Sequence, residues 1–78
     1  MLRSSSPIVR NPVLALPAAH ALGALPPESR EAMRAVLQDL ARDAAVRAET
    51  SWRQRKGPMA MYWRLVSVYA RHLSLALR

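Results

Sequence analysis

The chain is short and basic, with 78 residues, 12 Lys and Arg against 5 Asp and Glu, two His and no Cys. A chain of this length forms one small domain with a thin core, which gains stability by oligomerising or docking on another surface. Without cysteine there are no disulfides, thiolate nucleophiles or usual structural zinc sites, and two histidines do not make a histidine-rich metal site, so we predict no cofactor and no metal.

Residues 1–10 show no hydrophobic periodicity and are predicted to form a flexible arm. Two targeting interpretations stay open for residues 1–25. A charged start and an apolar run are typical of a secretory signal, although Pro12, Pro17 and His20 interrupt the run. An acid-free start with Ser and Arg is also typical of an organelle transit peptide. We take the flexible arm as the prediction and expect a cytoplasmic location in a bacterium or an infected host cell.

A short helix is predicted at about residues 17–24, within a single small helical domain that covers 11–78. Pro17 suits the first turn of a helix, and Gly23 suits its end. The apolar side chains of this segment are expected to lie across the two longer helices that follow. Leu25, which precedes Pro26-Pro27, must be extended, because a residue before proline avoids helical angles.

The longest predicted helix covers about residues 27–55. Acids near its start and bases near its end match the direction of the helix dipole. Two pairs at i, i+4, Asp43 with Arg47 and Glu49 with Arg53, have the favourable orientation. Its apolar stripe contains small side chains that would let another helix approach closely: Ala41, Ala44, Ala45 and Ala48.

Gly57 and Pro58 separate this helix from a last one, predicted at about 58–77. Proline is favoured at the first position of a helix, and glycine is favoured just past the end of the preceding one. In one continuous helix the Pro58 ring would clash with the carbonyl of Gln54, at a cost of about 3 kcal/mol. We therefore expect the chain to turn at 56–58.

The last helix has one broad apolar face and one narrow polar face. The residues that we assign to the core or to a dimer contact lie on the apolar face: Met61, Tyr62, Leu65, Tyr69, His72 and Leu73. The polar face holds Arg64, Ser67, Arg71, Ser74 and Arg78. The apolar face is wider than one helix contact needs, so the helix is expected to use two partners.

These observations predict an all-α fold, in which a short N-terminal helical segment covers an antiparallel two-helix hairpin. The bulky Tyr62, Leu65 and Tyr69 are expected to pack against the alanine stripe of the 27–55 helix. The surplus apolar face is expected to join two copies into a four-helix bundle. His72, on that face, is interpreted as a hydrogen-bonded core or interface residue rather than a ligand.

The positive charge of residues 50–78 is not balanced by any acid. Such a surface favours a polyanion, namely nucleic acid, an acidic protein face or anionic lipid. A GC-rich coding sequence would explain the preference for Arg over Lys, but it would not explain the missing acids. The charge therefore points to a macromolecular partner.

No arrangement of residues typical of an active site is present. The five acids are spread over 28–49, and the serines lie at termini, caps and exposed positions. Both glycines, Gly23 and Gly57, are explained as helix terminators, so no glycine-rich phosphate loop exists. We predict that the protein is not an enzyme and has no small-molecule substrate.

Two binding functions remain, with a third as a minor alternative. Trp and Arg dominate the energetics of protein interfaces, so a protein partner would contact the residues near the turn: Trp52, Arg53, Arg55, Lys56 and Trp63. The two tryptophans could instead simply close the hairpin. A nucleic acid would meet the basic side chains through its phosphates: Arg53, Arg55, Lys56, Arg64, Arg71 and Arg78. Residues 58–78 could also form an amphipathic helix on a membrane surface, although Ser rather than Lys on the polar face weakens that interpretation.

Three segments carry a resemblance to a known group of proteins. They are Leu25-Pro26-Pro27, the Trp52-Arg53-x-x-Lys56-x-Pro58-Met59 segment and the run from Tyr62-Trp63 to Tyr69. With them, about two thirds of the chain resembles small uncharacterised proteins of transposable, Mu-like bacteriophages and prophages from GC-rich bacteria. The resemblance implies no activity and no functional residues. What it implies is a context, an accessory or inhibitory protein that modulates a host defence, replication or transcription complex.

Overall fold

The computed structural model describes residues 11–78, which form helices and turns without a strand, so the all-α class predicted from the sequence is confirmed. A short 3₁₀ helix, η1 (Pro12–Ala15), is followed by α2 (Pro17–Gly23), α3 (Pro27–Arg53) and α4 (Gly57–Leu75). The sequence places the three longer elements at 17–24, 27–55 and 58–77. The predicted flexible arm, residues 1–10, lies outside the described residues.

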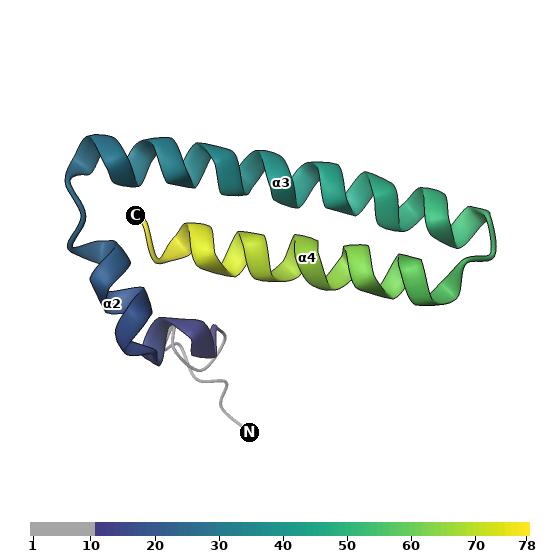
Figure 1. The fold of residues 1–78 in the computed structure, drawn as a ribbon, viewed down its shortest axis with the longest axis horizontal. Helices are drawn as coiled ribbons and strands as arrows, with labels where there is room; N and C mark the ends of the chain where they lie inside the picture. Colours follow the sequence, from purple (N-terminus) through teal and green to yellow (C-terminus); the bar gives the residue numbers. More distant parts are fainter. Residues whose placement is uncertain (1–10) are drawn as a thin grey trace, which may run out of the picture.

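The two long helices form the body of the molecule. α3 and α4 pack along each other and run in opposite directions, while α2 and η1 lie near the end of the pair that holds the C-terminus (Figure 1). In this view α4 lies between α3 and η1. The C-terminal residue is tied to the start of α3, because an Arg30 Nη1 donates to the Arg78 carbonyl at 3.2 Å.

Proline sets the start of each α-helix. α2, α3 and α4 all carry Pro in their first two positions, and none of them has a hydrogen bond from a capping side chain. Proline costs nothing in the first turn, since its missing N–H would have no partner there. Leu16 is extended before Pro17, as the restriction on residues preceding proline requires.

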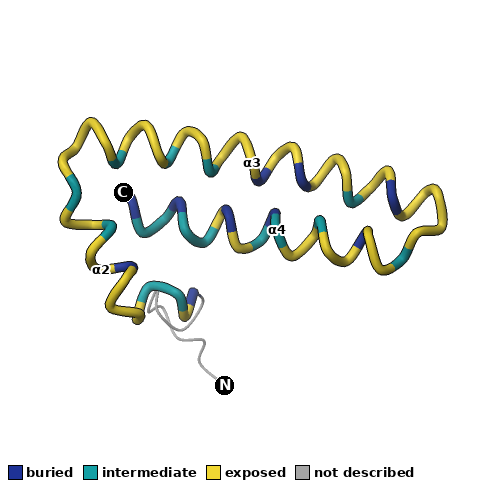
Figure 2. Tube along the Cα trace, viewed as in Figure 1, coloured by how far each residue is buried: buried dark blue, intermediate teal, exposed yellow. Residues whose placement is uncertain are grey.

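Small side chains form the contact between α3 and α4, and we call this line of contact the seam. Its buried positions recur at intervals of three, four and seven residues, as in an antiparallel coiled coil, and Figure 2 shows them where the helices face each other. They are Ala41, Ala44 and Ser51 on α3 and Ala60, Ser67, Ala70 and Ser74 on α4. The Ser67 hydroxyl donates to the Ala41 carbonyl at 2.7 Å, a direct side-chain to backbone contact between the helices.

The structure shows that the sequence prediction for α4 had the wrong face turned towards α3. Tyr62, Leu65 and Tyr69 do not pack on the alanine stripe; they are 55, 44 and 53% exposed. Ser67 and Ser74, expected on the polar face, are buried instead. Bulky side chains would hold the helices apart, whereas the serines fit a close contact and satisfy their hydroxyls on backbone carbonyls of Ala41 and Arg71.

The N-terminal segment is fastened to the far end of α4. Asn11 is buried, and its Nδ2 donates to the His72 carbonyl at 3.0 Å. The half-buried His72 ring meets the Tyr69 ring edge-on, with centroids 6.4 Å apart. Leu77, 2% exposed, is the largest fully buried side chain among the described residues. The N-terminal segment therefore packs on the C-terminal end of α4.

We expect Ala44→Leu to lower the free energy of unfolding by about 1–3 kcal/mol, because Ala44 is 1% exposed and a larger side chain would force the helices apart. Chemical denaturation followed by circular dichroism measures this change. Ala35→Leu, at an exposed position of the same helix, is the matched control and should change the free energy by less than about 0.5 kcal/mol. Equal stability of the two variants would show that the seam is not close-packed.

Candidate partner-binding groove

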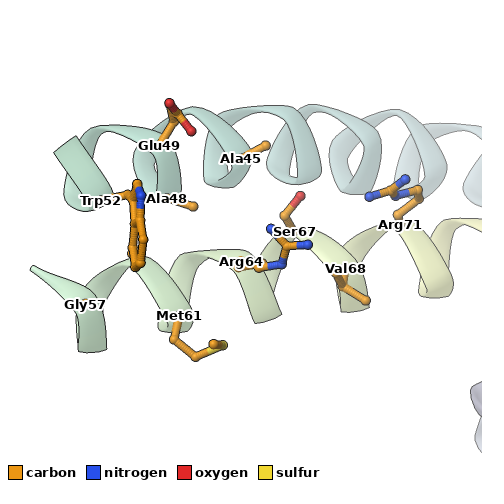
Figure 3. Close-up of a pocket in the computed structure, with 11 residues that line it drawn as sticks. Ala45, Ala48, Glu49, Trp52, Gly57, Met61, Arg64, Ser67, Val68 and Arg71 are labelled. Carbon is orange, nitrogen blue, oxygen red and sulfur yellow. The ribbon is translucent and has the colours of Figure 1, made fainter.

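A groove of about 570 Å³ runs along one side of the α3–α4 pair. Small residues from both helices form its floor, because small seam residues draw the helices together and their neighbours on this side are also small. We call the small lining residues, Ala45, Ala48, Gly57, Ala60 and Ser67, the floor and the larger ones, Glu49, Trp52, Met61, Arg64, Val68 and Arg71, the walls. Figure 3 shows these side chains along the two helices.

Trp52 closes the end of the groove next to the turn. Its side chain extends from α3 towards α4 beside Gly57 (Figure 3), and the residue is 69% exposed. An indole presents a large apolar surface and one N–H donor, and both are normally covered in a stable structure. An exposed tryptophan at the edge of a groove is therefore typical of a side chain that contacts a partner.

Arg64 and Arg71 supply positive charge along the α4 wall. They are seven residues apart and therefore lie on the same side of the helix, with both side chains directed towards α3 in Figure 3. Neither takes part in the ion pairs within residues 11–78, which are Arg42–Asp39, Arg47–Asp43 and Arg53–Glu49. Residues 1–10 contain no acid that could pair with them. The two arginines therefore keep their charge available in the groove.

Glu49 is the only acid that lines the groove, and it is already paired. Its Oε1 lies 3.3 Å from Arg53 Nε on the same helix. In Figure 3 its carboxylate points away from α4. Because Glu49 is engaged by Arg53, the groove as a whole is cationic.

The turn between α3 and α4 adds further positive charge beside Trp52. The N–H of Lys56 donates to the Ser51 carbonyl at 2.8 Å, and the N–H of Arg55 donates to the Trp52 carbonyl at 3.0 Å. This pair of bonds is a Schellman motif, and it puts Arg55 in the left-handed region with φ 58°. The sequence predicts a helix to about residue 55 with Gly57 as its terminator, and that role for Gly57 is wrong. α3 ends at Arg53, so the left-handed position falls on Arg55, and Gly57 begins α4 without a positive φ.

Trp63 has different surroundings from Trp52. It is half-buried and does not line the groove; the Arg47 guanidinium lies 5.3 Å from its ring centroid, and the Tyr62 ring meets it edge-on at 5.1 Å. Arg47 is itself held by Asp43 at 3.6 Å. Of the five residues predicted to contact a protein partner, the structure thus groups Trp52, Arg53, Arg55 and Lys56 at the turn and separates Trp63 from them.

Of the basic residues proposed for nucleic acid, Arg64 and Arg71 lie in the groove, while Arg78 ends the chain near Arg30. Sequence reasoning missed the floor of the groove altogether. The signal was present as small residues that recur in and beside the seam on both helices, at Ala45, Ala48, Gly57 and Ala60. From the sequence, Ala45 and Ala48 are interpreted only as aids to close packing and Gly57 only as a helix terminator, and Ala60 is given no role.

Exposed apolar side chains also lie outside the groove. Large apolar side chains from α3 and α4 remain exposed: Met33, Val36, Leu40, Tyr62, Leu65 and Tyr69. A hollow of about 380 Å³ lies between α2, α3 and α4, and it is lined by Leu22, Ala32, Met33, Val36, Leu37 and Leu73. We call these residues together the apolar face.

Comparison of the chain with protein-family models, curated proteins and solved structures gives no match. Among residues 11–78 no helix is long and apolar enough to cross a membrane. The same part of the chain has no group of three or more His, Cys, Asp or Glu side chains placed to hold a metal ion.

We expect Arg55→Gly to raise the free energy of unfolding by about 1 kcal/mol, because glycine adopts the left-handed conformation without a steric cost. Thermal and chemical unfolding of the two proteins measure the difference. Gln54→Gly, one residue earlier at φ −83°, is the control and should not stabilise the fold. If Arg55→Gly lowered stability, the Arg55 side chain would have to make a stabilising contact.

Proposed function

We propose that this chain is a non-enzymatic binding protein that docks on a macromolecular partner and modulates it. The observation that carries this proposal is Trp52, 69% exposed at the end of a cationic groove. Arg53, Arg55 and Lys56 surround it at the turn, so an aromatic anchor and positive charge occur on one surface. This combination is typical of the energetic centre of a protein interface.

The context that we propose is the cytoplasm of a bacterial or infected cell. There the protein would act as a phage-type accessory or inhibitor on a host defence, replication or transcription complex. Positive charge at the groove would speed association with an acidic protein surface and select against basic ones. The exposed indole would supply most of the affinity.

Binding to nucleic acid is the alternative, and the arrangement of the basic residues favours it less. A surface that tracks phosphates uses free cations in series. Here Arg53 is paired with Glu49, and Arg64 and Arg71 stand beside an alanine-rich floor together with Met61 and Val68. Apolar and small side chains between cations suit a protein partner.

Capture from nuclease-treated bacterial lysate on the immobilised protein tests the proposal. We expect a specific protein to be retained and its retention to fall by about thirtyfold with Trp52→Ala, the loss typical of an interface hot spot. Val46→Ala, at an exposed apolar position outside the groove, is the matched control and should leave retention unchanged.

The nucleic-acid alternative is tested in parallel. Labelled random duplex and single-stranded DNA are titrated with the purified protein, and binding is followed by fluorescence anisotropy. Micromolar binding at physiological salt that weakens log-linearly as salt rises would favour the nucleic-acid alternative. Retention of a protein irrespective of Trp52 would also contradict the proposed docking surface.

We propose further that two copies associate through the apolar face, which would produce the four-helix bundle expected from the sequence. Each chain carries a net charge of +7, so two copies repel each other in most relative orientations. The apolar face presents Met33, Val36, Leu40 and Tyr69, none of which is charged, and contact there would keep the groove cations out of the interface. Covering these side chains would also add apolar burial that the small-residue seam lacks.

Light scattering of the purified protein at micromolar concentration should give twice the chain mass of 8.7 kDa. Leu65→Arg with Tyr69→Arg should convert it to a monomer, because two cations per copy would be buried against each other. Val46→Arg, on an exposed part of α3 outside the apolar face, serves as the control and should leave the dimer intact. Monomer mass for the unmodified protein would contradict the proposed association.

A further inference from the structure

We infer that the groove receives one amphipathic helix of a partner protein, with two carboxylates seven residues apart that meet Arg64 and Arg71. This inference rests on the proposed function and adds the chemistry and the shape of the partner. Three observations support it: the seven-residue spacing of the residues that line the groove, the unpaired charges of Arg64 and Arg71, and the position of Trp52.

The residues that line the groove recur every seven positions along each helix. On α4, Gly57, Arg64 and Arg71 follow one another at this interval, as do Ala60 and Ser67 in the floor. Met61 and Val68 on α4 and Ala45 and Trp52 on α3 have the same spacing. Seven residues are two turns of a helix, the interval at which helices packed at a shallow angle meet equivalent positions. A third helix along the groove would find a small floor, an apolar wall and a cation at every second turn.

The charge of the groove selects an acidic helix. Arg64 and Arg71 are about 10 Å apart along α4 at the usual helical rise, so acids two turns apart on a docked helix would reach both. Neither arginine has an ion pair within the described residues, and Glu49 is already held by Arg53 at 3.3 Å. In coiled coils, charged pairs in these flanking positions determine the choice and orientation of the partner.

Trp52 sets one end of the contact and Arg71 the other. Gly57, beside Trp52, and Arg71 are separated by about 21 Å of helix, so the docked helix needs about four turns. At the Trp52 end, an apolar side chain of the partner would cover the indole above Ala48 and Ala60. The motif that fits the groove is therefore a large apolar residue near one end of an acidic helix.

This chain does not supply such a helix itself. Its acids are Glu28, Glu31, Asp39, Asp43 and Glu49, and no two of them are seven residues apart. Asp39, Asp43 and Glu49 are already paired on α3. Residues 1–10 contain no acid and carry Arg3 and Arg10, which the groove would repel. The distribution of charge therefore indicates that the acidic helix comes from a different protein.

The test is selection of a phage-displayed library of helix-favouring peptides, about six turns long with one face randomised, against the immobilised full-length protein. The selected peptides should carry Asp or Glu at two positions seven residues apart and a large apolar residue near one end. In fluorescence anisotropy with a selected peptide, Arg64→Glu and Arg71→Glu should each weaken binding, and together they should weaken it at least about tenfold. Lys in place of the two peptide acids should restore binding to this double variant.

Arg42→Glu is the matched control for each single reversal, because it changes the net charge equally at an exposed site outside the groove. Peptides without the acidic spacing, equal sensitivity to Arg42→Glu, or a library without binders would overturn the inference. If Trp52-dependent capture from lysate persists in those cases, the proposed function stands and only the acidic helix is wrong. If capture is also independent of Trp52, both fail.

Discussion

The close approach of α3 and α4 is the constraint on which the rest of the structure depends. Alanine and serine on both sides of the seam let the Ser67 hydroxyl reach the Ala41 carbonyl on the opposite helix. A line of small side chains cannot also enclose large ones. Tyr62, Leu65 and Tyr69 consequently remain on the outside of α4. The groove has the same origin, since small residues that flank the seam leave space between the two helices.

The same choice of side chains limits how much apolar surface the single chain buries. Alanine contributes little area, and Leu77 is the largest fully buried side chain in the described part of the chain. Hydrophobic stabilisation scales with the apolar area removed from water. A chain built this way gains stability whenever another surface covers its exposed side chains. A dimer at the apolar face and a partner helix in the groove would each do so, on different surfaces of the same pair of helices.

The two long helices differ in charge, and this difference supports separate surfaces for dimer formation and for partner binding. α3 carries all five acids of the chain, and three of them pair with arginines on the same helix. α4 has no acid at all, so Arg64 and Arg71 keep their charge for the groove. The strained backbone at Arg55 places one more cation next to Trp52 where glycine would be more stable. A residue held in a conformation that costs stability is typical of a functional surface.

The sequence by itself determined the all-α class, because helical periodicity and proline at the start of each helix are local properties of the chain. It also identified the alanines of α3 that lie in the seam, and the excess of positive charge. Only the tertiary structure decided which face of α4 meets α3. A hydrophobic pattern shows which residues avoid water, but steric fit between two helices and local hydrogen bonds of Ser67 and Ser74 determined which residues are buried. The groove could not be read from either helix alone, because it is made by small residues on both helices that are distant in sequence and become neighbours only when the chain turns at 54–56.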